Sequence, residues 1–324
     1  MQFYSLAQVK EALGAPALID ALEAAFAADG TAAPTYEAPM RAHHVVPGKG
    51  GEATHLLLMP SWQSGREIGI KLVGVNAANP SRAEDPQPMV QGIYMLMHAQ
   101  TGRPIAQMDA QELTWRRTAC ASGLASRFLS RSNSTSMGLL GAGAIAWYVF
   151  WAHQAVRPIQ RLRIWNRSAD KAQALAARIA AEFGIDAAAV TSPRQAIEGH
   201  DIVSSCTASM EPLIQGAWLS PGTHVDCLGG FRPNMREADD QVIRRADAIF
   251  VDTMDGALSE AGDIMVPIQS GLIAPSDIQA DLFALSRGEH SCRQNDQQIT
   301  FFKSVGTALE DLAAAQLVHR SIQG

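Results

Sequence analysis

The sequence has few cysteines, no excess of basic residues and no long apolar run. Its four cysteines are scattered and form no C-x-x-C pair, which indicates free thiols in a reducing compartment and gives no zinc-binding pattern. The net charge of −6 and the pI near 5.8 argue against a nucleic-acid partner. No apolar run approaches a membrane span, and residues 2–11 lack the order of a secretory signal. We therefore expect a cytoplasmic protein that binds neither nucleic acid, membrane nor metal.

What the sequence does contain is a glycine-rich turn with a specific spacing. Residues 137–140 are apolar and predict a buried strand, which runs directly into a G-x-G-x-x-A turn at residues 141–146. Gly141 allows the sharp turn, Gly143 lets the backbone approach a pyrophosphate, and Ala146 lets the next helix pack closely. The N–H groups at the start of that helix then face the phosphates. A glycine pattern alone is a weak signal, so its context has to support it.

The context is that of a βαβ unit. The spacing predicts a helix over residues 144–156 and a second apolar strand over residues 162–165. A coincidental glycine turn in another α/β domain is the alternative. We favour a dinucleotide-binding domain, in which the cofactor contacts of the turn are Gly141, Ala142, Gly143, Ala144 and Ile145.

The end of the second strand bears on the choice of cofactor. Enzymes that prefer NAD usually have Asp or Glu here, which accepts a hydrogen bond from the ribose 2′-hydroxyl. This chain has Asn166, Arg167 and Ser168 instead, with Lys171 one helical turn further on. Arg167 can pair with a 2′-phosphate, so we expect NADPH to be preferred, with NADH possible. The alternative is that Arg167 is an ordinary solvated residue at a helix start.

The rest of the pattern divides the 324 residues between two domains. A first helix is expected to follow Ser5 as its cap, to end near Ala28 and to stop at Gly30. Strands over residues 53–59, 68–75 and 90–97 predict an antiparallel sheet, and a helix over residues 113–129 connects it to the nucleotide domain. Beyond the second Rossmann strand the expected elements alternate as in a doubly wound sheet: helices over 169–183 and 237–244, strands over 187–191, 201–207, 225–228 and 248–251, and a last helix over 307–318.

Several short motifs occur in an order and spacing that resemble one known family. They are Gly69-Ile70-Lys71, Pro80, residues 101–104, Met108-Asp109, Leu113-Thr114, residues 117–119, residues 141–146, residues 165–167, and residues 303–306 with Glu310-Asp311. Together they are similar to the ornithine cyclodeaminase and mu-crystallin family over nearly the whole chain. The resemblance implies an α/β fold in which a Rossmann-type doubly wound domain is inserted into a smaller α+β substrate and dimerisation domain. It assigns residues 116–304 to the NAD(P)-binding domain and residues 1–115 with 305–324 to the smaller domain. It also implies that the protein is a homodimer.

Three basic residues are candidates for substrate binding: Arg41, Lys71 and Arg117. The resemblance implies that they bind the carboxylate of an amino or imino acid near the nicotinamide. A lysine within an apolar strand and an arginine at the start of a helix of small residues are costly unless they meet an anion. Lys71 beside two guanidiniums should have a lowered pKa and could pass a proton. The alternative is an edge-strand lysine that points to solvent.

A departure from the family pattern narrows the reaction. The cyclodeaminases and alanine dehydrogenases of the family look to have an Asp just after the position of Gly230. This chain has Phe231 there. The Phe231 ring cannot exchange a proton with a substrate amine. Residues 232–237 instead resemble mu-crystallin, a ketimine reductase, and the bacterial Δ1-pyrroline-2-carboxylate reductases. Residues 40–44, expected to form a loop, and residues 57–60 are similar to the same group, which adds His44 and Met59 as substrate contacts. For His43 and His44, loop histidines with satisfied hydrogen bonds are the alternative.

We therefore expect NAD(P)H-dependent reduction of cyclic 2-imino acids to L-proline and/or L-pipecolate. Arg41 and Arg117 would hold the carboxylate, and Lys71 would orient it and move the proton on nitrogen. The alternatives, in order, are reductive amination of an open-chain oxo acid as in an alanine dehydrogenase, cyclodeamination, and a mu-crystallin-like binding protein without catalysis. Ring size and pathway stay open. Two loops are assigned to the nicotinamide half of the cofactor: Cys206, Thr207 and Ala208, and Ser304 and Gly306.

Overall fold

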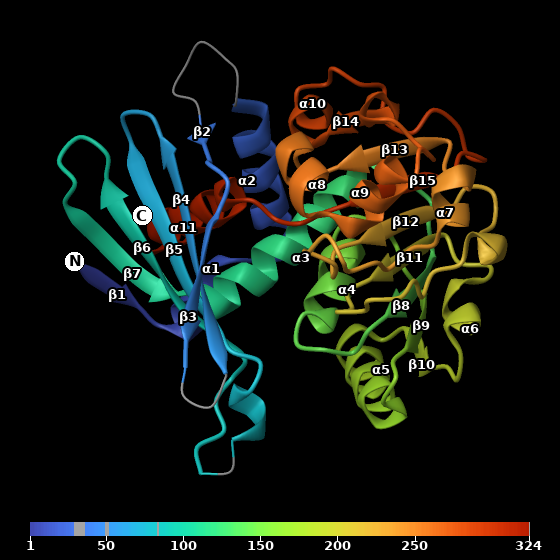
Figure 1. Cartoon of the computed structure of the whole chain (residues 1–324), viewed down its shortest axis with the longest axis horizontal. Helices are drawn as coiled ribbons and strands as arrows, with labels where there is room; N and C mark the ends of the chain where they lie inside the picture. Colours follow the sequence, from blue (N-terminus) through green and yellow to red (C-terminus); the bar gives the residue numbers. More distant parts are fainter. Residues whose placement is uncertain (29–35, 49–51, 83, 324) are drawn as a thin grey trace. The chain divides into compact units, whose positions relative to one another are not determined.

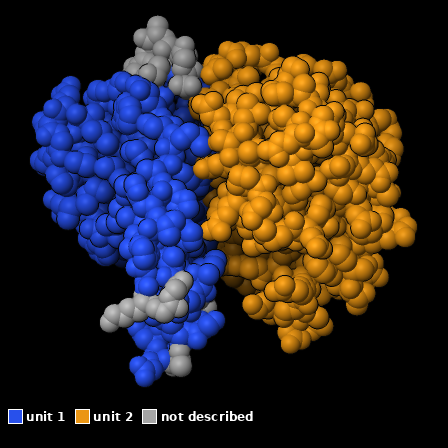
Figure 2. Space-filling model, viewed as in Figure 1, with its two compact units in different colours: residues 1–117, 307–324 blue, residues 118–306 orange. Residues whose placement is uncertain are grey.

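The computed structural model describes residues 1–28, 36–48, 52–82 and 84–323. The chain divides into two compact units (Figure 2): unit 1 comprises residues 1–117 and 307–324, and unit 2 comprises residues 118–306. Helix α3 (Ala110–Leu129) carries the chain from unit 1 into unit 2. Unit 1 is therefore built from both ends of the chain, and unit 2 is inserted between them. The helix stop expected at Gly30 lies outside the described residues.

Unit 1 contains a seven-stranded sheet, coloured blue to green in Figure 1. Its order is β1-β7-β6-β5-β4-β2, and β3 also pairs with β4. All of these pairs are antiparallel except that of β1 with β7. The strands are β1 (Gln2–Tyr4), β2 (Tyr36–Glu37), β3 (Ala42–Pro47), β4 (Ala53–Gln63), β5 (Glu67–Val75), β6 (Val90–His98) and β7 (Pro104–Asp109).

One face of this sheet packs against α11 (Ala308–Gln323). Ser61 lies opposite Gly69, and Lys71 lies opposite Tyr94, so that all four residues share this face. The hydroxyl of Ser61 donates to the first carbonyl of α11 at 2.8 Å. A Cβ on Gly69 would lie 1.8 Å from the hydroxyl oxygen of Tyr94. The glycine is thus required because Tyr94 fills the space beside Lys71 under the helix.

The opposite face of the sheet has apolar side chains that are exposed in this chain. Leu72 lies opposite Ile93, and they are 40% and 38% exposed. Phe3 pairs with Gln107, which pairs with Met95, so Phe3 belongs to the same face and is 71% exposed. Large exposed apolar areas are rare on monomeric proteins and mark interaction surfaces.

The prediction of one helix between Ser5 and Ala28 is wrong, because there are two. Helix α1 (Leu6–Ala12) does begin after Ser5, whose side chain accepts from the N–H of Gln8 in a capping box. Helix α2 (Ala15–Ala28) then starts anew. Gly14 is a poor helix former, and Pro16 clashes with the carbonyl four residues back unless it lies in the first turn of a helix.

The loop expected at residues 40–44 is also corrected, since residues from Ala42 onward form strand β3. This strand pairs with β4 in antiparallel register. The β-branched Val45 and Val46 favour an extended backbone, and β4 is 11 residues long, which leaves part of its edge open to a further strand. His43 and His44 therefore lie on a strand, where neighbouring side chains point to opposite faces.

Unit 2 contains an eight-stranded parallel sheet with the order β10-β9-β8-β11-β12-β15-β13-β14. From β8 the chain first adds strands on one side and then on the other, and right-handed crossovers place the helices of the two halves on opposite faces. This arrangement confirms the expected doubly wound Rossmann fold. The strands are β8 (Ser136–Leu140), β9 (Arg161–Trp165), β10 (Asp186–Ala189), β11 (Ile202–Ser205), β12 (His224–Cys227), β13 (Ala248–Val251), β14 (Ile278–Asp281) and β15 (Thr300–Lys303).

The helices of unit 2 connect these strands (Figure 1). The expected helix over residues 169–183 has the observed bounds of α5, whereas several short helices were not expected because five to eight residues show too little periodicity. In the described ranges no helix is both long and apolar enough to cross a bilayer. The helices are α4 (Ala146–Gln154), α5 (Ala169–Phe183), α6 (Pro193–Ile197), α7 (Asp240–Arg245), α8 (Met254–Glu260), α9 (Gly262–Gln269) and α10 (Leu282–Ser286). Among the described residues the 3-10 turns are η2 (Asn79–Ser81), η3 (Gly216–Trp218) and η4 (Pro275–Asp277).

Candidate active site

The turn between β8 and α4 has the geometry that a dinucleotide pyrophosphate requires. Gly141 has a φ of +109°, and a Cβ on it would lie 3.0 Å from Sγ of Cys206. Gly143 is exposed, and a Cβ on it would meet no atom within 4 Å, so there is open space beside its backbone. Ala146 begins α4 and is fully buried. The three small residues thus fit a bound dinucleotide in the way expected from their spacing.

Asn166, at the end of β9, holds this turn in place. Its side-chain oxygen accepts from the N–H of Ala142 at 3.2 Å, and its amide nitrogen donates to the carbonyl of Ser168 at 3.0 Å. The amide is therefore engaged with the backbone. Arg167, Ser168 and Lys171 are exposed, which leaves their polar groups accessible to a ligand.

Glu237 organises the loops that follow β11 and β12, and sequence reasoning assigned it no role. It is fully buried. One carboxylate oxygen accepts from the hydroxyl of Ser205 at 2.5 Å and from the N–H and hydroxyl of Thr207 at 2.8 and 3.1 Å. The other accepts from the N–H groups of Gly229 and Gly230 at 2.7 and 3.2 Å. One carboxylate thus fixes the loop of Cys206 to Ala208 to the glycines after the neighbouring strand.

Glu237 belongs to a buried charge cluster of unit 2 that we call the Lys303 cluster: Lys303, Glu237 and Asp263. The Nζ atom of Lys303 lies 3.1 Å from Asp263 and 3.6 Å from Glu237, and all three side chains are fully buried. Burial alone would lower the pKa of Lys303, but Asp263 and Glu237 outweigh it and raise that pKa. Burial also raises the pKa of Glu237, while Lys303 opposes this change. Lys303 is therefore held in its charged form.

Asp252 fixes the second loop assigned to the cofactor, and the sequence did not single it out either. Its Oδ2 atom accepts from the hydroxyl of Ser304 at 3.0 Å and from the N–H groups of Val305 and Gly306 at 2.8 and 2.6 Å. Gly306 has a φ of +80°, which favours glycine. Asp252 follows β13 directly, so a strand-end aspartate was the available sequence signal.

In unit 1, Lys71 and Arg117 share two buried carboxylates, and we call these four residues the Lys71 cluster. Nζ of Lys71 lies 3.0 and 2.8 Å from the two carboxylate oxygens of Asp311. Nε of Arg117 donates to Asp311 at 2.7 Å, and its Nη1 donates to Glu310 at 2.6 Å. Lys71 is 2% exposed on the central strand β5, so the alternative of a solvent-facing edge lysine is excluded.

The pKa of Lys71 is lowered to about 8 in these surroundings. Burial is the largest cause, and the guanidinium of Arg117 adds to it, while the charge and hydrogen bond of Asp311 act in the opposite direction. Arg41 is half-buried just before β3 and also lowers the pKa of Lys71. The lowered pKa expected from the sequence is therefore present, with burial as its main cause.

The register of β3, β4 and β5 places the other predicted substrate contacts. Met59 lies directly opposite Lys71 and is buried. Leu57 lies on the same face of the sheet as Met59 and pairs with His43, so His43 is on the Lys71 side. There the ring of His43 forms a hydrogen bond with the ring of His55 at 2.7 Å. His44 points to the other face and is exposed. The structure therefore does not bring His44 to the Lys71 cluster, because adjacent strand residues alternate.

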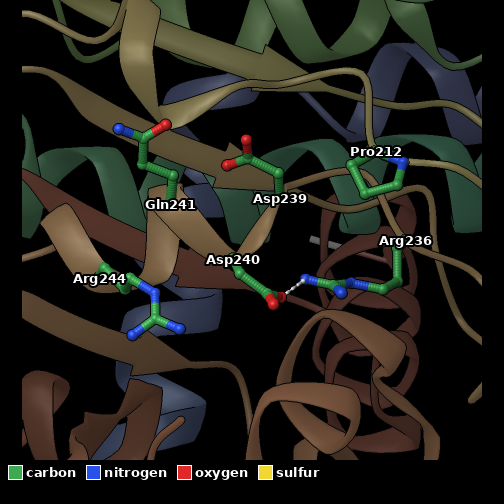
Figure 3. Close-up of a pocket in the computed structure, with 6 residues that line it drawn as sticks. All are labelled: Pro212, Arg236, Asp239, Asp240, Gln241 and Arg244. Carbon is green, nitrogen blue, oxygen red and sulfur yellow. Dashed lines mark hydrogen bonds and ion pairs between the residues drawn. The ribbon is translucent and has the colours of Figure 1, made fainter. Parts of the chain in front are cut away.

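A surface pocket of about 570 Å³ lies elsewhere in unit 2 (Figure 3). Arg236 and Asp240 point toward each other across it and form an ion pair at 2.8 Å. None of the predicted site residues is among those that line it: Pro212, Arg236, Asp239, Asp240, Gln241 and Arg244. In the described ranges no three His, Cys, Asp or Glu side chains are arranged to hold a metal ion.

A Rossmann unit with a dinucleotide turn, joined to a unit with a buried lysine and arginine, defines a nucleotide-dependent oxidoreductase of small anionic substrates. The chain belongs to the ornithine cyclodeaminase/mu-crystallin family, whose model matches residues 2–324. The resemblance identified from the sequence motifs is therefore confirmed.

Individual relatives agree with this class. A Δ1-pyrroline-2-carboxylate reductase of Paracoccus denitrificans is 38% identical over 267 residues, which are 82% of each chain. The Thermococcus litoralis Δ1-pyrroline-2-carboxylate reductase, solved with NADH and L-proline, has a TM-score of 0.91 and 30% identity, covering 100% of this chain and 98% of the other. An archaeal alanine dehydrogenase dimer with bound NAD has a TM-score of 0.89 and 26% identity, covering 100% and 96%. These relatives confirm the expected class, an oxidoreductase related to imine reductases.

Proposed function

We propose that the protein reduces cyclic 2-imino acids, Δ1-pyrroline-2-carboxylate and/or Δ1-piperideine-2-carboxylate, to L-proline and/or L-pipecolate with NAD(P)H. The observation that carries this proposal is Lys71, a buried amine with a pKa of about 8 next to Arg117. A pKa near the working pH is what a proton donor needs. The two reductases of this reaction among the relatives support the choice of substrate.

Each basic residue has a distinct role in the proposal. Arg117 and Arg41 bind the substrate carboxylate as planar donors. The ammonium of Lys71 gives a proton to the imine nitrogen: one N–H bond of Lys71 breaks, the N–H bond of the iminium forms, and Lys71 becomes a neutral amine. It regains its proton from water after product release. The protonated imine accepts hydride far better than the neutral one, so this transfer promotes the reduction.

The dinucleotide, when bound, supplies the hydride. Residues 141–145 would hold its pyrophosphate, and the loops fixed by Glu237 and Asp252 would contact its nicotinamide half. Arg167 and Lys171, both exposed beyond the end of β9, support a preference for NADPH because they can pair with a 2′-phosphate. Two of the relatives were solved with NADH or NAD. They support a nicotinamide dinucleotide as the cofactor, but not the 2′-phosphate that distinguishes NADPH.

Phe231 argues against cyclodeamination in this chain. Its side chain is 41% exposed and apolar, and it directly follows the two glycines bound by Glu237. An apolar ring can neither take a proton from an attacking amine nor give one to a leaving amine. Reductive amination of an open-chain oxo acid stays the second candidate, because the alanine dehydrogenase shares the fold over the whole chain.

We further infer that the exposed apolar face of the unit 1 sheet pairs with a second copy of the chain. Leu72, Ile93 and Phe3 lie on this face, and burying them in a dimer would remove their apolar area from water. The archaeal alanine dehydrogenase was solved as a dimer, which supports this assembly. Sedimentation should give a dimer for the wild type and a monomer for Ile93→Glu, whereas an unchanged dimer in that variant would place the interface elsewhere.

The test of the reaction is cofactor oxidation by the purified protein with each imine, with NADPH and NADH in parallel and without ammonia. We expect rapid oxidation and formation of L-proline or L-pipecolate. Oxidation that needs a 2-oxo acid and ammonia would move the assignment to open-chain reductive amination. No oxidation in either assay would favour a ligand-binding protein.

A further inference from the structure

Two buried carboxylates in the Lys71 cluster need an explanation. Glu310 and Asp311 are fully buried beside the cations that we propose to bind a substrate carboxylate, and an incoming anion is repelled by both. Acidic residues weaken an anion site, so they must serve a purpose other than attraction. The inference rests on the proposed function of Lys71.

The two carboxylates have different partners. Glu310 accepts from Nη1 of Arg117 at 2.6 Å. One oxygen of Asp311 accepts from both Nε of Arg117, at 2.7 Å, and Nζ of Lys71, at 3.0 Å, and the other oxygen lies 2.8 Å from Nζ. Asp311 therefore joins the two cations and fixes the direction of the amine, whereas Glu310 acts on the guanidinium.

The balance of charge also depends on Asp311. Lys71 and Arg117 are two cations that share the two carboxylates of Glu310 and Asp311. Burial, Arg117 and Arg41 all lower the pKa of Lys71, and Asp311 raises it. Without Asp311 the other causes named here all lower the pKa of Lys71, so a smaller fraction of the amine would carry the proton that the reaction needs.

We propose that Asp311 is the positioning residue of Lys71: it holds the amine beside Arg117 and keeps it charged at neutral pH. Asp311 repels the substrate carboxylate, but this unfavourable interaction is outweighed because Asp311 keeps Lys71 protonated and in position. Asp311 touches neither substrate nor cofactor in this account, and it acts through Lys71.

The test compares Asp311→Asn with Glu310→Gln, two isosteric substitutions that each remove one buried charge. We would measure kcat/KM for the same imine from pH 6 to 10, so that ionisation of the substrate cancels between variants. The wild-type rate should fall above a midpoint near 8. Asp311→Asn should move this midpoint down by about 1–3 pH units, and Glu310→Gln should leave it near 8. Equal shifts in both variants, or no shift in Asp311→Asn, would overturn the proposal.

A second variant and a second measurement keep the proposal testable if Asp311→Asn does not fold or if the imine reaction fails. Asp311→Glu keeps the charge but displaces it by one methylene, so kcat should fall while the midpoint stays near 8; wild-type kcat would contradict a positioning role. If the wild type reduces no imine, the proposed function fails. NMR titration of 13Cε-labelled Lys71 in the wild type and Asp311→Asn still measures the shift directly, and an unchanged titration would overturn the inference by itself.

Discussion

Two buried lysines, one in each unit, have opposite electrostatic surroundings. Lys71 pairs with Asp311 but also faces Arg117 and Arg41, and burial with Arg117 brings its pKa down to about 8. Lys303 lies between Asp263 and Glu237, which raise its pKa against the effect of burial. Both residues are buried lysines, so the opposite directions of their pKa shifts come from the neighbouring charges: Lys71 has cations beside its carboxylate, and Lys303 has two carboxylates.

The difference in pKa suits Lys71 to proton transfer and Lys303 to a structural role. Lys71 can lose and regain its proton within the range in which proteins work, and this suits proton transfer. Lys303 keeps its charge and neutralises two carboxylates, one of which, Glu237, fixes the loops of Thr207 and Gly229. A buried lysine is thus no evidence of catalysis until its neighbours are known.

The largest effect should come from Lys71→Met. Without a proton donor, kcat/KM for the imine should fall by about 10²–10⁴-fold. Arg117 still pairs with Asp311, so the circular dichroism spectrum should be unchanged. Activity near the wild-type value would remove Lys71 from the mechanism.

The same substitution in the other cluster, Lys303→Met, should reduce stability. It leaves two buried carboxylates without their cation, which costs about 3–5 kcal/mol in the free energy of unfolding. Urea denaturation of this variant beside Lys71→Met measures the contrast. At a temperature where the variant is folded, its remaining activity should still decline above pH 8. Equal stability of both variants would show that the two clusters do not differ as described.

The pH dependence of the wild type gives the next effect in size. Lys71 must be protonated to act as a donor, and its pKa lies near 8, so kcat/KM should fall about tenfold per pH unit above that value. Two imines of different basicity should give the same midpoint if the lysine controls the rate. A midpoint that follows the substrate would assign the dependence to the imine.

An exposed cation of unit 2 should behave unlike either buried lysine. Arg167→Ala should raise the KM for NADPH about tenfold, since one charged hydrogen bond in solvent is lost, and should leave the KM for NADH nearly unchanged. Arg163→Ala is the control, because Arg163 lies in the middle of β9, a few residues before Arg167, and pairs with Asp186 at 2.7 Å. An equal change for both cofactors would exclude a 2′-phosphate contact.

The smallest effect should be that of His44→Ala. His44 faces away from Lys71, whereas His43 shares its side of the sheet. The KM for the imine should therefore stay within about twofold of the wild type in His44→Ala and change more in His43→Ala. The reverse order would show that the strand register does not decide which histidine matters.

The sequence predicts the elements that depend on local pattern. Apolar runs and small residues were enough for β8, the turn at Gly141 and the strands that follow. The break between α1 and α2 was also readable from Gly14 and Pro16 but was missed.

Contacts between distant residues could not be predicted in this way. Lys71 and Asp311 are 240 positions apart, and Glu237 is 66 positions from Lys303, so their pairing follows from the folded chain alone. The side of the sheet on which His44 lies depends on strand register, which residues 40–44 did not reveal when they were assigned to a loop. The sequence indicated roles for Lys71, Arg41 and Arg117, whereas the Glu310-Asp311 motif gave no sign of its pairing with Lys71 and Arg117.

The most direct test of this account is an NMR titration of the wild-type protein with 13Cε-labelled lysine. The chain has five lysines, so the signals of Lys71 and Lys303 can be assigned from their methionine variants. The account predicts that Lys71 titrates near pH 8 and that Lys303 keeps its proton throughout the range in which the protein stays folded. A Lys71 signal that titrates above pH 10 would contradict the account.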